Sequence, residues 1–403
     1  PGLSGTVAST GKLSGSRTSP IIAANIAVDN LKQGANQIQR LRGEANIDAG
    51  GVGRSQLKII GDSLVLGGQK WQSLQVDGSG TAAAHDLKAE LSGEPGSFLL
   101  ALAGSLQTPA MLWQGRITQL TAKNTPAGNW SLEKPAAVRA SAKEASLDTA
   151  CLSSAPTRLC LQGQWQQAGD FNGRVQLSNL NPDQFKRFFP KEVALTTSIN
   201  GEATVSGKIG GALLGKANVT IAPGNVSLQN QGRPVTIAFN GGTLKLDSNG
   251  RTATSQARLD LGSTGQLQAN LQVQDPLGAG RLNGKIEGAI TDLKIVSAFV
   301  PEITEISGQV RADVALGGTL TKPLMRGDVR LENTALSIPE AGLKLRAVQF
   351  AATSTGQGPI RLAGSVQSEP GQLQVDGHYD PFKGQLILAI IGENFQALKT
   401  TDV

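Results

Sequence analysis

The chain has 403 residues, of which 39% are hydrophobic, 17% are charged and only 4% are aromatic. This apolar content is too high for a disordered chain. The net charge of +6 is spread without a run of Lys or Arg, so no nucleic-acid partner is expected. The 50 glycines and the few large side chains favour a thin, strand-rich fold over a thick globular interior.

The two cysteines, Cys151 and Cys160, lie at the inner ends of two apolar runs separated by a Ser-Ser-Ala-Pro segment. Ser and Pro favour a turn at that point. The two thiols then face each other across a hairpin, and we expect a disulfide and an oxidising compartment. Two free buried thiols in a cytosolic sheet are the alternative. A metal site needs more ligands than two Cys and two distant His supply, so no metal is expected.

Two short helices are expected, one near the middle of the chain and one about 110 residues later. Asn181 followed by Pro182 is typical of a helix start, and Pro190 ends the run. Thr291 and Pro301 bound the second helix in the same way. Both segments are short enough to cap a sheet edge without changing the fold class.

Period-two alternation dominates the remaining sequence. Between Gln266 and Gln274, Leu, Ala and Val alternate with Gln and Asn, and the segment from Gln309 to Leu316 behaves similarly. Such alternation indicates strands with one apolar and one wet face. Turn sequences such as Asn249-Gly250 recur about every ten residues. The sequence therefore predicts an all-β chain that forms a long antiparallel meander.

A meander with one apolar face must cover that face. Folding the sheet lengthwise into an elongated, U-shaped trough (a β-taco) covers part of it and leaves an apolar groove. Eight residues from neighbouring strand-like runs are the candidate groove lining: Leu267, Leu271, Val273, Val310, Val314, Leu316, Val329 and Leu331.

Internal repeats organise the chain. The segment Leu3–Asn30 aligns without a gap with Ile306–Asn333, and a third copy begins at Ile199. Repeats of a strand–turn unit predict a quasi-one-dimensional stack. We expect one continuous repetitive region over residues 1–403, with repeat-like units near 1–34, 182–228 and 292–338. Because the chain begins at Pro1, we interpret it as a fragment of a longer protein.

These repeats, two of which are preceded by a Phe-x-Pro segment, carry a resemblance to the TamB family. That family is the inner-membrane subunit of the translocation and assembly module and is related to the AsmA-like bridge proteins. The stretches around His85, Trp113 with Trp130, and the cysteines with Trp165 resemble the same family. The family's N-terminal membrane anchor and its last C-terminal segment have no counterpart here. The resemblance implies the periplasm of a Gram-negative cell envelope, inner-membrane anchoring through a segment absent here, and an outer-membrane Omp85-type barrel partner with periplasmic domains.

The function that follows is a conduit for phospholipids between the inner and outer membranes, with acyl chains lying along the apolar groove. The alternative is a chaperone or scaffold for the insertion of outer-membrane β-barrel proteins and autotransporters, together with the Omp85-type partner. The sequence does not separate the two.

No catalytic residue is expected, and the chain is not expected to be an enzyme. The only candidate bases are His85 and His378, and neither pairs with a positioned nucleophile, so we interpret both as surface or turn residues. The Gly-rich stretch 207–215 lacks the lysine pattern of a phosphate-binding loop, so no cofactor is expected. The four tryptophans are interpreted as groove or rim packing.

Overall fold

Strands fill almost the whole of the computed structural model, which describes residues 2–17, 19–107, 110–188, 193–230, 233–293, 302–339, 342–368, 371–381 and 383–395. The chain divides into two compact units. Unit 1 comprises residues 1–180 and 204–211, and unit 2 comprises residues 181–203 and 212–403. Strand β15 (Ile199–Lys208) is divided between them.

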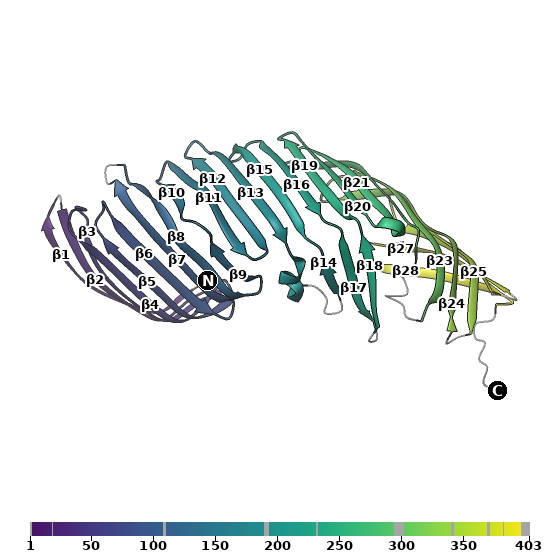
Figure 1. Ribbon diagram of the computed structural model, residues 1–403, viewed down its shortest axis with the longest axis horizontal. Helices are drawn as coiled ribbons and strands as arrows, with labels where there is room; N and C mark the ends of the chain where they lie inside the picture. The colour runs from purple at the N-terminus through teal and green to yellow at the C-terminus, as the bar shows by residue number, and fades with distance from the viewer. Residues whose placement is uncertain are drawn as a thin grey trace, which may run out of the picture. The chain divides into compact units, whose positions relative to one another are not determined.

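Unit 1 is an antiparallel meander in which each strand pairs with its neighbour in sequence (Figure 1). The exception is β9 and β10, which both pair with β8 and β11. The strands are β1 (Leu3–Ser16), β2 (Ser19–Gln33), β3 (Asn36–Asp48), β4 (Ser55–Leu66), β5 (Gln69–Gly80), β6 (His85–Gly93), β7 (Gly96–Gln107), β8 (Leu112–Thr125), β9 (Gly128–Leu132), β10 (Ala136–Ala140), β11 (Glu144–Ser154), β12 (Thr157–Gln166) and β13 (Asp170–Leu180).

Unit 2 contains a second antiparallel meander and a separate three-stranded sheet, β14–β17–β18. The strands of the small sheet are β14 (Val193–Thr196), β17 (Gly224–Asn230) and β18 (Arg233–Phe239). The meander consists of β16 (Leu213–Ile221), β19 (Gly241–Asn249), β20 (Thr252–Asp260), β21 (Gly265–Gln274), β22 (Arg281–Ile290), β23 (Thr304–Gly318), β24 (Pro323–Ile338), β25 (Leu343–Thr355), β26 (Ile360–Ser368), β27 (Gly371–Asp380) and β28 (Gln385–Glu393).

A line of irregular residues crosses each meander near one end of its strands, and we call it the fold line. In unit 1 it passes through Asn30 and Ser63, both with φ of 52°. In unit 2 it passes through Asn333 and Ala347, with φ of 51° and 48°. The strand registers shift at or near these positions, as in β1–β2 and β24–β25. Because β-bulges bend a strand and increase its twist, the fold line is where the sheet creases.

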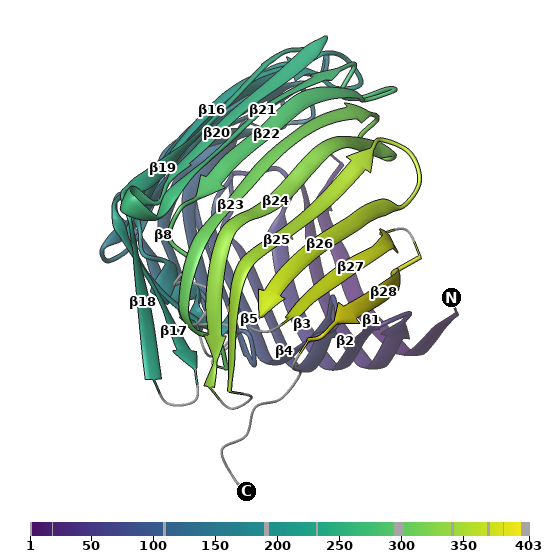
Figure 2. The same cartoon turned by 90° about the vertical axis from the view of Figure 1, so that its right-hand side faces the viewer.

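Several of the most buried side chains of the described residues lie at the fold line. Leu64 is 2% exposed and Thr334 is 1% exposed. Others beside the line are also buried: Val28, Ala150, Ile306 and Val348. Away from the line the strands are half-exposed on one face and exposed on the other. Figure 2 shows β23, β24 and β25 curving along their length. The predicted all-β antiparallel meander, curled into a trough, is confirmed within each unit.

The aligned segments of the sequence repeat share unusual backbone conformations. Gly5 and Gly308 have φ of 119° and 125°, and Asn30 and Asn333 have φ of 52° and 51°. The hairpin turns also correspond, with Gly15 opposite Pro20 in one copy and Gly318 opposite Pro323 in the other. Gly201 of the third copy does not have a positive φ. One repetitive region over the whole chain stays a prediction.

The first expected helix is present as a 3-10 helix, η1 (Pro182–Phe188), and the Oδ1 atom of Asn181 accepts a hydrogen bond from the Asp183 backbone N–H at 3.0 Å. A second 3-10 turn, η2 (Gly262–Thr264), was not expected. Most of the other expected helix, from 294 to 301, lies outside the described residues. Within the described part of the chain, no helix is long and apolar enough to cross a membrane.

Candidate functional site: the apolar faces

Strand registers decide which side chains share a face of the sheet. In unit 2, Leu267 lies opposite Gly288, which lies opposite Ala312. Ala312 in turn lies opposite Val329. We call the face that carries these residues the apolar face of unit 2, and its reverse the polar face. All eight residues predicted to line a groove lie on this one apolar face: Leu267, Leu271, Val273, Val310, Val314, Leu316, Val329 and Leu331.

Sequence reasoning missed strand β22, which lies between β21 and β23. Leu282 lies opposite Val273, Ile286 opposite Val314, and Ile290 opposite Val310. These three residues therefore belong to the same apolar face. Gly284 and Gly288 interrupt the alternation of β22 in the sequence, and this hid the strand.

The glycines make room for the leucines of the adjacent strand. A Cβ atom added at Gly284 would lie 2.8 Å from Leu271 Cδ2, and one at Gly288 would overlap Leu267. The leucine side chains thus lie across the neighbouring strand and close over its backbone. The resulting surface is aliphatic with low relief.

The apolar face of unit 2 stays accessible. Val329 is 40% exposed and Ile286 is 36% exposed. The predicted groove residues of β21 and β23 are half-buried. Half-exposed aliphatic side chains on one continuous face are what an apolar ligand needs for contact without unfolding of the protein.

The polar face of the same strands carries opposite charges close together. Lys285 Nζ lies 2.6 Å from Glu287 Oε1 and 3.0 Å from Asp313 Oδ2. The hydrogen bonds to Glu287 and then Asp313 raise the pKa of Lys285 above its ordinary value. Such exposed pairs stabilise the sheet little. They keep this face hydrated, so the two faces differ sharply in polarity.

Unit 1 has an apolar face built by the same registers. Ala45 lies opposite Leu57, which lies opposite Gly78. Gly78 lies opposite Leu87, and Leu87 opposite Leu102. The four tryptophans of the chain also lie on this face by register: Trp71, Trp113, Trp130 and Trp165. This placement agrees with their interpretation as groove or rim packing.

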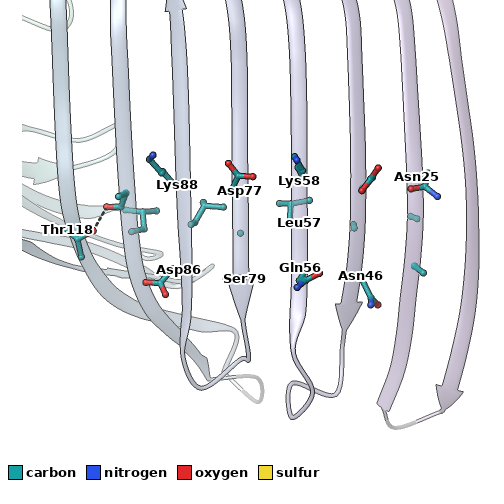
Figure 3. A pocket seen from close by; sticks show the side chains of 18 residues that line it. Asn25, Asn46, Gln56, Leu57, Lys58, Asp77, Ser79, Asp86, Lys88 and Thr118 are labelled. Atoms are coloured by element: carbon teal, nitrogen blue, oxygen red, sulfur yellow. Dashed lines mark hydrogen bonds between the residues drawn. The ribbon is translucent and has the colours of Figure 1, made fainter.

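The polar face of unit 1 is hollowed where four strands, β3 to β6, carry alternating charges (Figure 3). Lys58 lies opposite Asp77, which lies opposite Lys88. The hollow has a volume of about 760 Å³. The pKa of Lys88 is raised by its hydrogen bond to Glu90. Because Glu44, on the next strand beyond Lys58, continues the alternation of sign, the hollow favours neither anions nor cations.

The disulfide joins Cys151 and Cys160, which lie directly opposite each other on β11 and β12 with their Cα atoms 4.0 Å apart. Cys160 in turn lies opposite Gln176 on β13, so the disulfide lies on the polar face. The Arg158 guanidinium lies 3.1 Å from Cys151 Sγ and pairs with Glu133 at 3.0 Å. The expected turn occupies residues 155–156.

The two histidines occupy different places. His378 is exposed on the polar face, opposite Ile387. His85 is the first residue of β6 and follows a turn, as interpreted from the sequence. It is half-buried on the apolar face, where it accepts a hydrogen bond from Trp113. Among the described residues, no three metal-ligating side chains cluster.

The sequence itself matches known proteins. Residues 1–331 match the family model described as TamB, N-terminal domain. The chain belongs to the TamB family. The resemblance inferred from its motifs is thereby confirmed. No solved structure matches the chain.

A relative of this TamB-family chain is the translocation and assembly module subunit TamB of Haemophilus influenzae. The two are 22% identical over 338 residues, which cover 82% of this chain and 26% of the relative. The chain thus spans about a quarter of the length of that relative.

Proposed function

We propose that this chain is part of a periplasmic conduit in which phospholipid acyl chains lie against the apolar faces on their way between the inner and outer membranes of a Gram-negative cell. The observation that carries the proposal is the half-exposed aliphatic face that runs from strand to strand in unit 2. Lipid headgroups would remain in water beyond the edge of that face.

The energetics of this face suit movement. Each CH₂ group removed from water gains about 0.8 kcal/mol wherever along the face it lies. Because Leu267 and Leu271 lie flat over the glycines of β22, neighbouring positions offer similar contacts. A nearly uniform surface avoids deep traps, and transport requires a shallow energy profile. No chemical step is needed, so we propose that the chain is not an enzyme.

The second candidate is a scaffold for the assembly of outer-membrane β-barrel proteins and autotransporters with an Omp85-type partner. The name of the relative, a translocation and assembly module subunit, favours this role. In the described residues, β14 and β18 are the outer strands of the small sheet. Outer strands can accept a further strand from another chain.

A charge on the apolar face separates the roles. Leu271→Asp places a carboxylate on the half-buried face, which costs several kcal/mol unless water follows it. The matched control is Asn270→Asp on the next residue, which faces the polar side opposite Lys285. We expect Leu271→Asp to remove co-purified phospholipid and to weaken the outer membrane, and Asn270→Asp to do neither. Mass spectrometry of lipid extracts and an outer-membrane permeability assay measure the two effects.

Equal lipid content and permeability in both variants, with circular dichroism showing both folded, would contradict the conduit. Tight binding to the periplasmic domains of the barrel partner that survives in Leu271→Asp would then support the assembly role. If Leu271→Asp unfolds the chain, Val314→Asn with Asp313→Asn as its control repeats the test with neutral polar groups.

A further inference from the structure

A separate cavity of about 440 Å³ opens at the edge of the apolar face of unit 1, on the side away from the fold line. The surface that lines it is mostly apolar and includes Leu57, Leu87, Leu102, Leu106 and Met111. Gly78 lies between Leu57 and Leu87, where an added Cβ atom would lie 3.2 Å from Leu87 Cδ1, so its missing side chain leaves space between the two leucines. Binding pockets for small ligands have volumes of roughly 300–1,000 Å³, so the cavity is large enough for part of an alkyl chain.

Hydrogen bonds between loops hold the wall of this cavity in place. The backbone N–H of Ala82 donates to Gly51 O at 3.1 Å, and that of Leu106 donates to Ala82 O at 2.7 Å. Asp48 anchors the loop that carries Gly51 by accepting from the Gly50 backbone N–H at 2.9 Å. The cavity is therefore formed before any ligand arrives, and binding does not have to order it.

The two ring side chains of the cavity, His85 and Trp113, are hydrogen-bonded to each other. Trp113 Nε1 donates to His85 Nε2 at 2.8 Å, and His85 Nδ1 lies 2.9 Å from Thr81 O. Because an indole N–H can only donate, His85 Nε2 is the acceptor. Its Nδ1 atom therefore carries the hydrogen and donates a hydrogen bond to the backbone oxygen of Thr81. Neither ring has a polar atom left for a ligand.

The charged residues at the cavity indicate which kind of lipid headgroup can remain outside it. Asp48 and Asp86 are among the lining residues, and no Lys or Arg is. The Asp48 carboxylate accepts hydrogen bonds from its own loop. The side chain of Asp86, between His85 and Leu87, points to the polar face. An anionic headgroup at the opening would therefore find no cationic lining residue, whereas a zwitterionic group carries its own counter-charge.

We propose that this cavity is a discrete binding station for the end of one alkyl chain of a zwitterionic lipid, with the hydrogen-bonded His85–Trp113 pair as its wall. The proposal rests on the proposed function and adds to it a preferred stop on an otherwise uniform surface. A lipid seated there would hold its headgroup in water at the open edge.

Tryptophan quenching tests the station in the 403-residue chain. One variant keeps Trp113 alone, with the other three tryptophans changed to Phe, and a second keeps Trp71 alone. Trp71 lies on the same apolar face but at the fold-line end, in edge-to-face contact with Phe98. The probe is a monomeric lysophosphatidylcholine with bromine atoms near the end of its chain. We expect Trp113 to be quenched at an about tenfold lower concentration than Trp71.

Filling or opening the cavity completes the test. Ala82→Phe occupies the space and should abolish the quenching at low concentration without changing that of Trp71. If Ala82→Phe fails to fold, Met111→Asn removes an apolar wall at an exposed position whose φ of 46° Asn tolerates, and it should weaken binding severalfold.

The outcomes separate the station from the conduit. Equal quenching of the two tryptophans, or quenching of Trp113 that Ala82→Phe and Met111→Asn leave unchanged, would overturn the station and leave the conduit intact. If neither Trp113 nor Trp71 is quenched, both the station and the conduit are contradicted.

Discussion

The apolar faces of the two units arise from the same alternation but present different surfaces. In unit 1 the face carries all four tryptophans of the chain and opens into a cavity beside His85 and Trp113. In unit 2 the face is largely aliphatic, and leucines lie flat over glycines such as Gly284. Alternation therefore decides which face is apolar, whereas side-chain size on adjacent strands decides whether that face is smooth or hollowed.

The largest effect is expected at the fold line, a feature that each unit has. Leu64→Ala removes a side chain that is only 2% exposed, and we expect it to lower the free energy of unfolding by about 2–5 kcal/mol. Leu57→Ala, on the half-buried apolar face of the same strand, should cost less than half as much. Urea unfolding followed by circular dichroism measures both. Equal costs would mean that the crease is not the core of unit 1.

Removing the disulfide should affect only one unit. We expect the double variant Cys151→Ala, Cys160→Ala to lower the stability of unit 1 by roughly 2–3 kcal/mol, because the bridge restricts the unfolded chain. Hydrogen exchange should accelerate in β11 and β12 and remain unchanged in β21 to β25. Acceleration in both units would show that the two unfold together.

The repeated backbone conformations allow a matched test across the units. Gly5→Ala and Gly308→Ala each place a Cβ atom where φ is positive and backbone atoms are close, at 2.5 Å from Asn30 O and 2.7 Å from Thr334 Cα. Each should cost about 1–2 kcal/mol. Asn30→Gly and Asn333→Gly are the controls and should change stability little, since glycine adopts the same φ. Thermal unfolding of all four variants tests whether the two positions are equivalent.

The smallest effect is expected on the polar face of unit 2. The Lys285 side chain is 44% exposed. Its raised pKa means that its contribution to stability is present at neutral pH and lost as the pH rises above about 10.5. Lys285→Gln should therefore shift the unfolding midpoint only slightly at pH 7, and the difference from the unchanged protein should disappear in alkali. A large shift at pH 7 would mean that the polar face contributes to stability more than exposed ion pairs usually do.

The strands and their faces could be predicted because the alternation is regular. The turn at Pro156 and the pairing of Cys151 with Cys160 followed from local sequence in the same way. The fold line could not be foreseen, because bulges shift the register at single residues such as Asn30, whose neighbours have no special composition. A change in apolar spacing from two to three residues, as between Gly61 and Leu64, is the signal that could have revealed it.

The candidate site was predicted in part for the same reason. The groove residues of β21, β23 and β24 were chosen by period, and the registers place them together. The station in unit 1 was not predicted from the sequence, because it depends on contacts between residues that are distant in the chain. His85 and Trp113 are 28 positions apart, and only the pairing of β6, β7 and β8 brings them together.

The correspondence between the hairpins β1–β2 and β23–β24 has a consequence for how such proteins change in length. A hairpin adds two strands, returns the chain to the same edge, and leaves the direction and the inward face of every later strand unchanged. With neighbouring strands about 4.8 Å apart, duplication or loss of one hairpin would lengthen or shorten the sheet by roughly 9.6 Å. Evolution can thus change the length of such a sheet in discrete increments without redesigning its apolar face.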